Sequence, residues 1–475
     1  MWMKKNDALF SNTVVLGVAA VLSKAAVFFL MPFYTAYLSP AEFGAADVLV
    51  GTALLLLPFV SFNMPEAAFR FVAGDQYEKR EILSVSGFLL LLGAALFFLL
   101  LPLTSFSSLL FAYRGYLFFY VLASLGRSFL AHLLRAEGKY LLYAAQQVLC
   151  TLLTVLLQIV FLAVLQRGTG GYLLGVILAD ATVFFCLLPV LRPWRYVSPF
   201  AIKVAVIKKM LGYSLPLIPT AVLWWITSVS DRYILLHYHG AALTGLYAAS
   251  SRIPSALTFL VGVFLEAWQY SAISTREGDR AARYGRIYSF LLPVVIVGGA
   301  GVLALAYPLA SLIYAPEYRE AVMFVPFLTL SALFSALSSF LGSIYTVNLK
   351  SSATLVTALF GACLNIVLNF LLIGRFGGVG AAFATLMAYF AVFLVRALHS
   401  RRYLCFSHHA VKFTFSLLFL WLAAFAVMRE GYVIALLPAV LSPLPFFFEI
   451  IDGISLFWEK LTDLQKKRQK RTKGY

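Results

Sequence analysis

The side chains in this sequence that could do chemistry are a few ionisable groups within long apolar stretches. Lys24, Asp231, Arg232 and Arg252 lie inside such stretches, and Asp47 lies near the start of another. An ionisable group surrounded by hydrocarbon is costly unless it faces protein or water. These residues therefore mark a candidate site for binding or transport.

Polar residues recur at helical spacing around these charges. The two series are Thr220, Trp224, Thr227, Ser228 and Asp231, and Arg252, Ser255, Phe259, Gly262 and Glu266. Residues three or four positions apart share one face of a helix, so each series would form a polar stripe. We interpret the stripes as walls of a hydrated central cavity. The alternative is that the charged side chains pair with one another and hold the helices together.

The sign of this cavity depends on which charges face it. Three deep cations, Lys24, Arg232 and Arg252, outnumber the carboxylate of Asp231. A cationic cavity suits an anionic ligand, and the planar fork of arginine suits phosphate. Flanking acidic residues are Asp47, Glu66 and Glu266. Their carboxylates would cancel the excess positive charge if they faced the same cavity.

The composition identifies the elements that must position these residues. Hydrophobic residues make up 62% of the 475 residues and charged residues 12%, whereas soluble domains are about half apolar and about a quarter charged. In a bilayer, the backbone amides must be paired within helices or closed barrels. The unbroken apolar run from Phe88 to Leu103 lacks the alternation of barrel strands. The sequence therefore predicts an all-α integral membrane protein.

The apolar runs divide into about fourteen transmembrane helices of about 20 residues each. We place them near 11–33, 45–65, 83–102, 112–132, 141–165, 172–190, 212–236, 243–268, 287–307, 321–346, 352–373, 378–396, 411–427 and 432–450.

Lysine and arginine residues predict the orientation. With the N-terminus in the cytoplasm, 29 of the 37 basic residues fall in inner segments and five in outer ones, as the positive-inside rule requires. The net charge of +17 is therefore typical of cytoplasmic loops and not of nucleic-acid binding. We expect a multi-pass protein of the bacterial inner (plasma) membrane, with both termini cytoplasmic. The basic tail, 453–475, would be a solvated anchor or would contact anionic lipid.

Catalytic and metal sites are not predicted. The four cysteines, Cys150, Cys186, Cys363 and Cys405, are scattered without metal-ligand or redox spacing. The outer connections 237–242 and 374–377 leave no room for a folded external domain. We therefore expect a transporter, not an enzyme.

A weak internal repeat predicts the domain organisation. The segments 39–44 and 240–245 each join two predicted helices and lie about 200 residues apart, and repeated halves are common in transporters. We predict an N-terminal lobe at 1–200, a C-terminal lobe at 201–405, two additional helices at 406–452 and the cytoplasmic tail at 453–475.

Several segments, in order, resemble a known family. The first runs from Gly17 to Asp47 and contains Lys24 and the stretch Ser39 to Gly44. The others are 66–71, 230–233, 245–254, 266–269 and 365–385. Together they resemble the polysaccharide-biosynthesis membrane proteins, which are the O-antigen and capsule flippases (Wzx-type) of the MOP exporter superfamily. The likeness covers roughly residues 9–400.

The resemblance implies two six-helix lobes in a V around a central cavity, followed by two C-terminal helices. It also implies translocation of an undecaprenyl-diphosphate-linked oligosaccharide from the inner to the outer leaflet by alternating access. The residues that would line the substrate cavity are Lys24, Arg70, Trp224, Ser228, Arg232 and Arg252. Asp47, Asp231 and Glu266 would couple transport to an ion or proton, and no other cofactor is expected. Expected partners are the lipid-linked oligosaccharide, membrane lipid, and the polymerase and glycosyltransferases of the same pathway.

Other functions fit parts of the sequence. A drug or cation exporter of the same superfamily would need a more acidic cavity, and a peptidoglycan-precursor flippase would share the fold. A membrane glycosyl-polymerase or ligase would need external catalytic residues, for which the short outer segments leave little room. A purely structural scaffold would leave the intramembrane charges unexplained.

Overall fold

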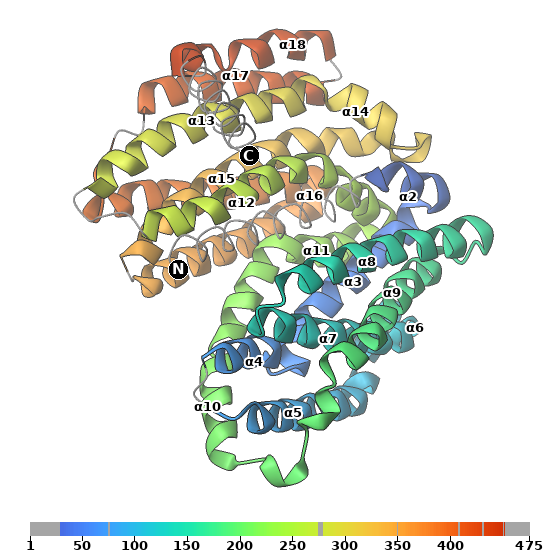
Figure 1. The fold of residues 1–475 in the computed structure, drawn as a ribbon. Coiled ribbons are helices and arrows are strands. Elements are labelled where there is room, and N and C mark those ends of the chain that lie inside the picture. The colour runs from blue at the N-terminus through green and yellow to red at the C-terminus, as the bar shows by residue number, and fades with distance from the viewer. Residues whose placement is uncertain are drawn as a thin grey trace, which may run out of the picture. The chain divides into compact units, whose positions relative to one another are not determined.

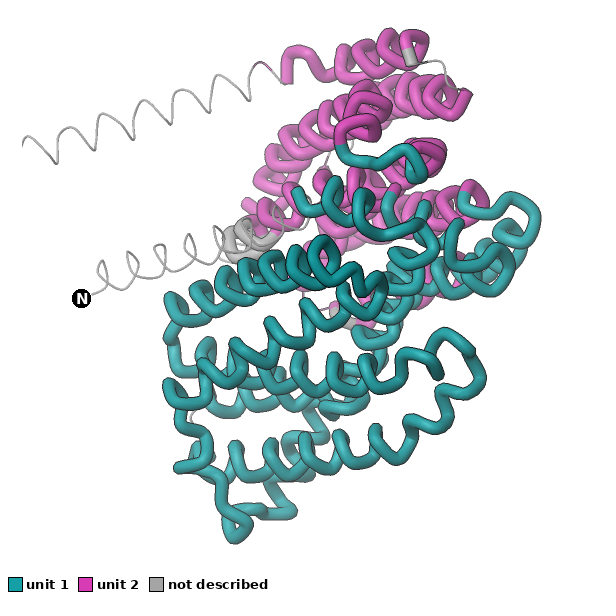
Figure 2. Tube along the Cα trace, turned by 90° about the vertical axis from the view of Figure 1, so that its right-hand side faces the viewer, with its two compact units in different colours: residues 1–249, 313–318, 366–378 teal, residues 250–312, 319–365, 379–475 magenta. Residues whose placement is uncertain are grey.

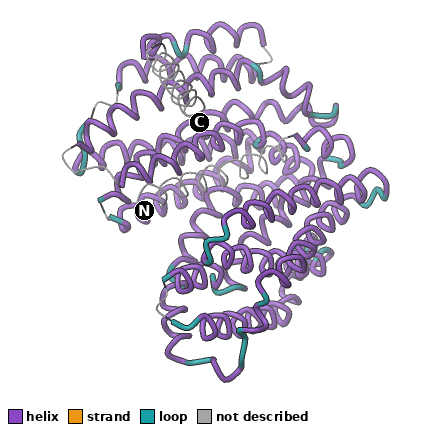
Figure 3. Tube along the Cα trace, viewed as in Figure 1, coloured by secondary structure: helices purple, strands orange, loops and turns teal. Residues whose placement is uncertain are grey.

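The computed structural model describes residues 29–74, 77–273, 279–348, 350–406, 409–429, 432–449 and 451. These residues form helices joined by short connections, and the described part of the chain contains no strand (Figure 3). The predicted all-α membrane fold is therefore confirmed. The predicted first span up to residue 28, including Lys24, lies outside the described residues, as does the basic tail from 452 onward.

Ten helices among the described residues are long and apolar enough to cross a membrane, and two shorter apolar helices cover 252–265 and 433–449. Two of the ten runs each join two helices across a kink at a glycine. The run Val204–Ser250 has a non-helical residue at Gly240, with φ of 80°, and Ser352–Arg402 has one at Gly377, with φ of 55°. Glycine adopts these angles without a steric penalty. Both turns fall between the predicted helix pairs, so the plan of about fourteen spans is consistent with the structure.

The chain forms two compact units (Figure 2). Unit 1 contains residues 1–249, 313–318 and 366–378. Its helices, labelled in Figure 1, are α2 (Met31–Tyr37), α3 (Pro40–Val60), α4 (Met64–Ala73), α5 (Lys79–Leu100), α6 (Ser108–Ala112), α7 (Arg114–Ala136), α8 (Tyr140–Gln158), α9 (Gly168–Leu191), α10 (Val204–Ser214) and most of α11 (Leu217–Ser250).

Unit 2 contains residues 250–312, 319–365 and 379–475. Its helices are α12 (Arg252–Ile273), α13 (Arg280–Ala304), most of α14 (Ala306–Ile313), α15 (Val325–Val347), most of α16 (Ser351–His399), α17 (Ala410–Met428) and α18 (Tyr432–Leu441). Helix α15 lies at its centre and packs against α12, α13 and α17. The predicted lobe boundaries at 200 and 405 stay predictions.

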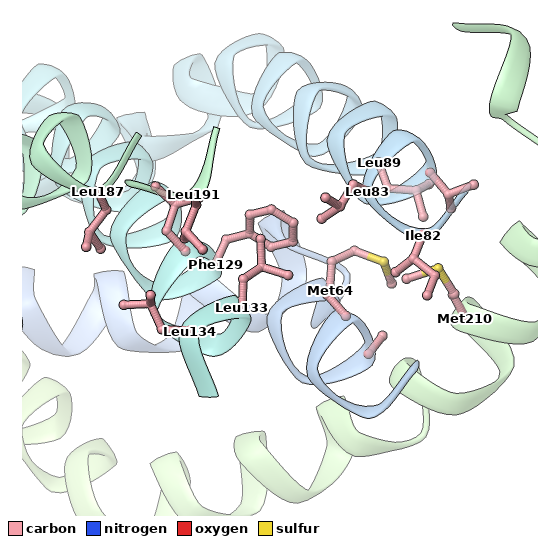
Figure 4. Close-up of a cluster of buried hydrophobic side chains, with 14 of the residues drawn as sticks. Met64, Ile82, Leu83, Leu89, Phe129, Leu133, Leu134, Leu187, Leu191 and Met210 are labelled. Atoms are coloured by element: carbon pink, nitrogen blue, oxygen red, sulfur yellow. The ribbon is translucent and has the colours of Figure 1, made fainter. Parts of the chain in front are cut away.

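An apolar core holds unit 1 together. Met64 of α4, Leu83 of α5, Phe129 of α7, Leu187 of α9 and Met210 of α10 converge in one buried cluster (Figure 4). Helices in lipid gain little from hydrophobic burial, so close van der Waals packing of this kind stabilises their association. The cluster fixes α4, α5, α7, α9 and α10 as one scaffold.

Helix α3 starts at a capping box. The Ser39 hydroxyl accepts the backbone N–H of Glu42 at 3.3 Å, and the Glu42 carboxylate accepts the backbone N–H of Ser39 at 2.9 Å. Pro40 occupies the first helical position, where its missing N–H costs nothing. The cap fixes the start of the helix and hence the rotation at which Asp47, two turns further on, is presented.

Small residues let α3 approach α11 closely. Gly44 lies against the backbone of Ala241 and Gly245, and a Cβ atom added at Gly245 would overlap the carbonyl oxygen of Pro40. Close backbone approach at small residues is a common way to join membrane helices. The contact places the start of α3 directly beside the part of α11 that follows Gly240.

Gly245→Ala is expected to destabilise unit 1 by about 1–3 kcal/mol, because the added methyl group forces two backbones apart. The measurement is the unfolding temperature of the purified protein in detergent. Gly115→Ala in α7 is the matched control, since a Cβ there meets nothing within 4 Å. Equal unfolding temperatures for the two variants would contradict the close contact.

Candidate functional site

A charged cluster joins α3 to α11 within unit 1. The Arg232 Nε atom lies 2.5 Å from Asp47 Oδ2, and Arg232 Nη1 donates to the carbonyl oxygen of Ser228 at 2.6 Å. Asp231 Oδ1 accepts the backbone N–H of Arg232 at 2.9 Å, and the Tyr247 hydroxyl donates to Asp231 Oδ2 at 2.6 Å. We call Asp47, Asp231, Arg232 and Tyr247 the ion cluster.

The ion cluster is largely shielded from its surroundings. The side chains of Arg232, Asp47 and Asp231 are 13%, 12% and 5% exposed. Asp47 is the main charge partner of the guanidinium, because Asp231 is 3.5 Å from Arg232 Nη1. Asp231 is thus a buried carboxylate held mainly by a hydroxyl and a backbone amide. Such a group is suited to exchanging a proton or a small cation.

Neighbouring polar contacts orient the two helices that carry the cluster. The Trp225 indole N–H donates to the carbonyl oxygen of Gly51 at 2.7 Å. The hydroxyls of Tyr233 and Thr52 lie 2.6 Å apart, and the Tyr233 ring packs against Trp225 with centroids 5.2 Å apart. These contacts flank Arg232 along α11 and set its register against α3.

The structure brings together four of the residues predicted for the site. Asp47, Asp231 and Arg232 meet in the ion cluster, and Ser228 contributes its backbone carbonyl oxygen. Arg232 therefore has protein partners here, and its role in substrate binding stays a prediction. Trp224 lies on the same helix with 61% of its surface exposed.

The contacts described above assign no place in the ion cluster to the other predicted site residues. Arg70 lies exposed on α4, and Arg252 begins α12 in unit 2. Lys24 lies outside the described residues, and so does the side chain of Glu266 in α12. Their assignment to a substrate cavity stays a prediction.

Unit 1 contains a second ion pair, formed by Arg127 and Asp180. Asp180 of α9 accepts a hydrogen bond from Arg127 Nε of α7 at 2.6 Å, one from the Cys150 thiol of α8 at 3.1 Å, and one from the Ser124 hydroxyl. Asp180 lies within the predicted span 172–190. Arg127 lies near the end of the predicted span 112–132 and is one of the 29 basic residues assigned to inner segments. The pair links α7, α8 and α9 at one point.

Unit 2 contains a buried arginine, Arg396, which is another of the 29 basic residues assigned to inner segments. Arg396 of α16 is 9% exposed. Its Nη1 donates to the carbonyl oxygen of Ser338 in α15 at 2.9 Å, and its Nε donates to the Thr357 hydroxyl at 3.1 Å. Arg396 thus joins α15 to both halves of α16, and no sequence pattern marks these partners.

The N-terminal end of unit 1 is tied to the segment 313–318. The Thr35 hydroxyl of α2 donates to the carbonyl oxygen of Ile313 at 3.0 Å and accepts the backbone N–H of Ala315 at 3.1 Å. The Tyr318 hydroxyl donates to the carbonyl oxygen of Leu38 at 2.9 Å. In the predicted topology these contacts lie at the outer surface.

Outside the spans, Glu137 lies between two lysines. It forms an ion pair with Lys139 at 2.7 Å and another with Lys79. Burial alone would raise the pKa of Glu137, but the two ammonium groups outweigh it and lower this pKa below its usual value.

Because the pKa of Glu137 is lowered, its ion pairs stabilise the folded protein at neutral pH and lose this effect in acid. A lowered carboxylate pKa gives stability that is present above the unfolded-state pKa, about 4.3, and is lost as the pH falls through the folded-state value. We expect Glu137→Gln to destabilise the protein by less than about 1 kcal/mol at pH 7, since partly exposed pairs contribute little. Thermal unfolding should show this difference unchanged between about pH 7 and pH 5 and decreasing as the pH falls below about 4.3. A difference that grows as the pH falls would contradict the assignment.

Comparison with known proteins identifies the family. The sequence model of the polysaccharide biosynthesis protein family matches residues 9–269, which is more than half of the chain. The chain belongs to this family. The matched region contains the whole ion cluster.

Relatives and solved structures extend this result. An uncharacterized membrane protein of Methanocaldococcus jannaschii is 26% identical over 402 residues, which cover 77% of this chain and 92% of that protein. The lipid II flippase MurJ in an inward closed conformation matches with a TM-score of 0.72 and 16% identity, covering 94% of this chain and 100% of that chain. The MATE transporter VcmN of Vibrio cholerae matches with a TM-score of 0.59 and 15% identity, over 83% and 98%.

These structural matches show the fold. This member of the polysaccharide biosynthesis family has the fold of MurJ and of the MATE transporters of the MOP superfamily. It is a multi-pass membrane protein of the polysaccharide biosynthesis family. Among the described residues, no group of three or more His, Cys, Asp or Glu side chains could hold a metal ion.

Proposed function

We propose that this protein flips an undecaprenyl-diphosphate-linked oligosaccharide from the cytoplasmic to the outer leaflet by alternating access, for surface polysaccharide synthesis. One observation carries the proposal: the family match at residues 9–269 includes a buried ion cluster inside membrane spans. A family that serves polysaccharide synthesis handles sugars, and buried charges in a span point to the path of a polar or charged cargo.

The ion cluster supports coupling between an ion and the substrate. When Asp231 takes up a proton or a Na⁺ ion, its attraction for Arg232 falls. The guanidinium is then held mainly by Asp47 and can move more readily to a diphosphate, which it can bind with two parallel hydrogen bonds. Release of the ion restores the pairing and expels the anion. Asp47 and Glu266 are the further carboxylates of this cycle.

Other predicted residues complete the substrate path in this proposal. Lys24, Arg70 and Arg252 supply cations for the diphosphate and for acidic sugars. The exposed indole of Trp224 offers an apolar face to a sugar ring, beside Ser228. The protein would lie in the bacterial inner membrane with both termini cytoplasmic and would receive its cargo from glycosyltransferases and deliver it to a polymerase.

Removal of Arg252 or Lys24, two cations predicted to bind the substrate, tests the substrate assignment. We expect Arg252→Ala and Lys24→Ala each to reduce polymer export at least about tenfold, the effect of losing about 1.4 kcal/mol of charge-assisted binding. Membrane abundance should stay normal, as measured by immunoblot beside polymer at the cell surface. Lys350→Ala is the matched control, because this lysine lies in a predicted cytoplasmic connection. Wild-type export in both variants would defeat the cationic-site assignment.

A second candidate function is a peptidoglycan-precursor flippase, because the fold matches the lipid II flippase MurJ with a TM-score of 0.72. Purified protein in liposomes separates the two. Flipping of a fluorescent undecaprenyl-diphosphate oligosaccharide, without flipping of lipid II, supports the proposed function. Flipping of lipid II alone supports the second candidate.

A further inference from the structure

An apolar pocket of about 430 Å³ lies in unit 1 between α3, α5, the 3₁₀ turn Leu101–Phe106, α6 and α7. Its wall includes Leu56 and Phe59 of α3, Leu96 of α5 and Leu103 of the turn. These lining elements belong to predicted membrane spans or their ends. Leu96 and Leu103 are 43% and 65% exposed, so the mouth of the pocket faces the hydrocarbon of the bilayer.

The chemistry of the lining selects an apolar occupant. The lining side chains with hydroxyl groups are Thr52, Thr104 and Tyr233, and no charged residue lines the pocket among the described residues. The Thr52 and Tyr233 hydroxyls lie 2.6 Å apart, and the carbonyl oxygen of Val48 lies 2.8 Å from Thr52 Oγ1 and 3.2 Å from Tyr233 Oη, so the two hydroxyl hydrogens are shared among these three contacts. A buried water needs two to four polar partners, and these hydroxyls are already engaged. A hydrocarbon chain fits this lining better.

The wall of the pocket includes a residue that directly follows the ion cluster in the chain. Tyr233 lines the pocket and directly follows Arg232 in α11. Its hydroxyl contacts Thr52, which lies just over one turn beyond Asp47 in α3. A lipid whose charged group lay at Arg232 would therefore have this pocket beside the first part of its chain.

One wall of the pocket contains the break between α3 and α4. Phe62 and Asn63 have φ of 47° and 53°, which are uncommon for residues other than glycine. Phe62 lines the pocket, as does Gly93 of α5, where a Cβ atom would overlap the carbonyl oxygen of Val60. An occupant would thus contact the point at which this span changes direction.

We propose that this pocket binds the start of the polyprenyl tail of the lipid-linked substrate, next to its diphosphate. The inference rests on the proposed function, because it assigns the pocket to that substrate. The position beside Arg232 favours the substrate's tail over the acyl chain of a bulk phospholipid, because a diphosphate offers the guanidinium more charge and more acceptor oxygens than a single phosphodiester does.

Photolabelling of the purified protein in nanodiscs tests the proposal. The probe is an undecaprenyl diphosphate with a diazirine on the isoprene unit next to the diphosphate, and labelled peptides are read by mass spectrometry. We expect label in 93–106, with competition by unlabelled undecaprenyl diphosphate. Leu96→Trp and Leu103→Trp fill the pocket and should each reduce this label about tenfold, or about 1.4 kcal/mol of binding free energy. Leu99→Trp is the matched control, since Leu99 lies on α5, is 70% exposed and does not line the pocket.

Two other outcomes of this experiment would overturn the inference. Label that is unchanged in both pocket variants would place the tail elsewhere. A diacyl phospholipid probe that labels 93–106 equally, without competition by undecaprenyl diphosphate, would assign the pocket to bulk lipid. The assay contains no glycan, so it can fail while the wild-type protein still flips oligosaccharide in liposomes. It can also succeed when flipping fails, so the two proposals fail separately.

Discussion

Asp231→Asn should reduce oligosaccharide flipping at least about tenfold while the protein stays folded, because it removes the charge that the transport cycle exchanges. The asparagine keeps the shape of the side chain and an oxygen that can accept from Tyr247. Arg232 keeps Asp47 as its charge partner, so no buried charge loses its main partner. The measurement is flipping in liposomes with an imposed pH or Na⁺ gradient.

The gradient dependence separates coupling from simple damage. Wild-type flipping should respond to one of the two gradients, and the residual flipping of Asp231→Asn should respond to neither. Tyr247→Phe is the matched control, because it removes the hydrogen bond to Asp231 and leaves every charge in place. We expect it to slow flipping and to keep the gradient response. A gradient response in Asp231→Asn equal to that of the wild type would rule out this carboxylate as the coupling group.

Arg232→Ala should lower the stability of the protein by about 3–5 kcal/mol, because it removes a guanidinium from between two buried carboxylates. The expected signs are a lower unfolding temperature in detergent and reduced membrane abundance. The effect is an electrostatic one, so the double variant Arg232→Ala with Asp47→Asn should recover part of the loss.

This second prediction also decides between the two interpretations that the sequence left open. If Arg232 holds the helices together, the single variant is unstable and the double variant is partly rescued. If it serves substrate binding alone, Arg232→Ala unfolds at the wild-type temperature and loses transport only. The unfolding temperatures of the single and double variants, measured side by side, distinguish these cases.

The hydropathy of the sequence was sufficient to predict the fold class of the protein and the positions of most of its helices. Each span must be apolar along its own length and must satisfy its own backbone hydrogen bonds, so the signal is local. The turn at Gly377 falls between the predicted helices 352–373 and 378–396 for this reason. The cost of intramembrane charge likewise singled out Asp231 and Arg232 without any knowledge of the fold.

The partners of those charges depended on tertiary structure. Asp47 and Arg232 lie far apart in the sequence and meet because the capping box at Ser39 and the contact at Gly44 fix the rotation and approach of α3 against α11. Arg127 is paired with Asp180 because α7 packs against α9 and places the two side chains together. The polar stripe on α11 was visible, but the pocket beside Tyr233 was not.

Local sequence thus determined that this chain spans a membrane, roughly where its helices lie, and that a few charges, such as Asp231 and Arg232, lie at membrane depth. The tertiary structure decided which of those charges neutralise one another and where an apolar pocket opens. The physical reason is that lipid selects each helix separately by its hydrophobicity, whereas helix rotation and register are set by close packing between distant segments.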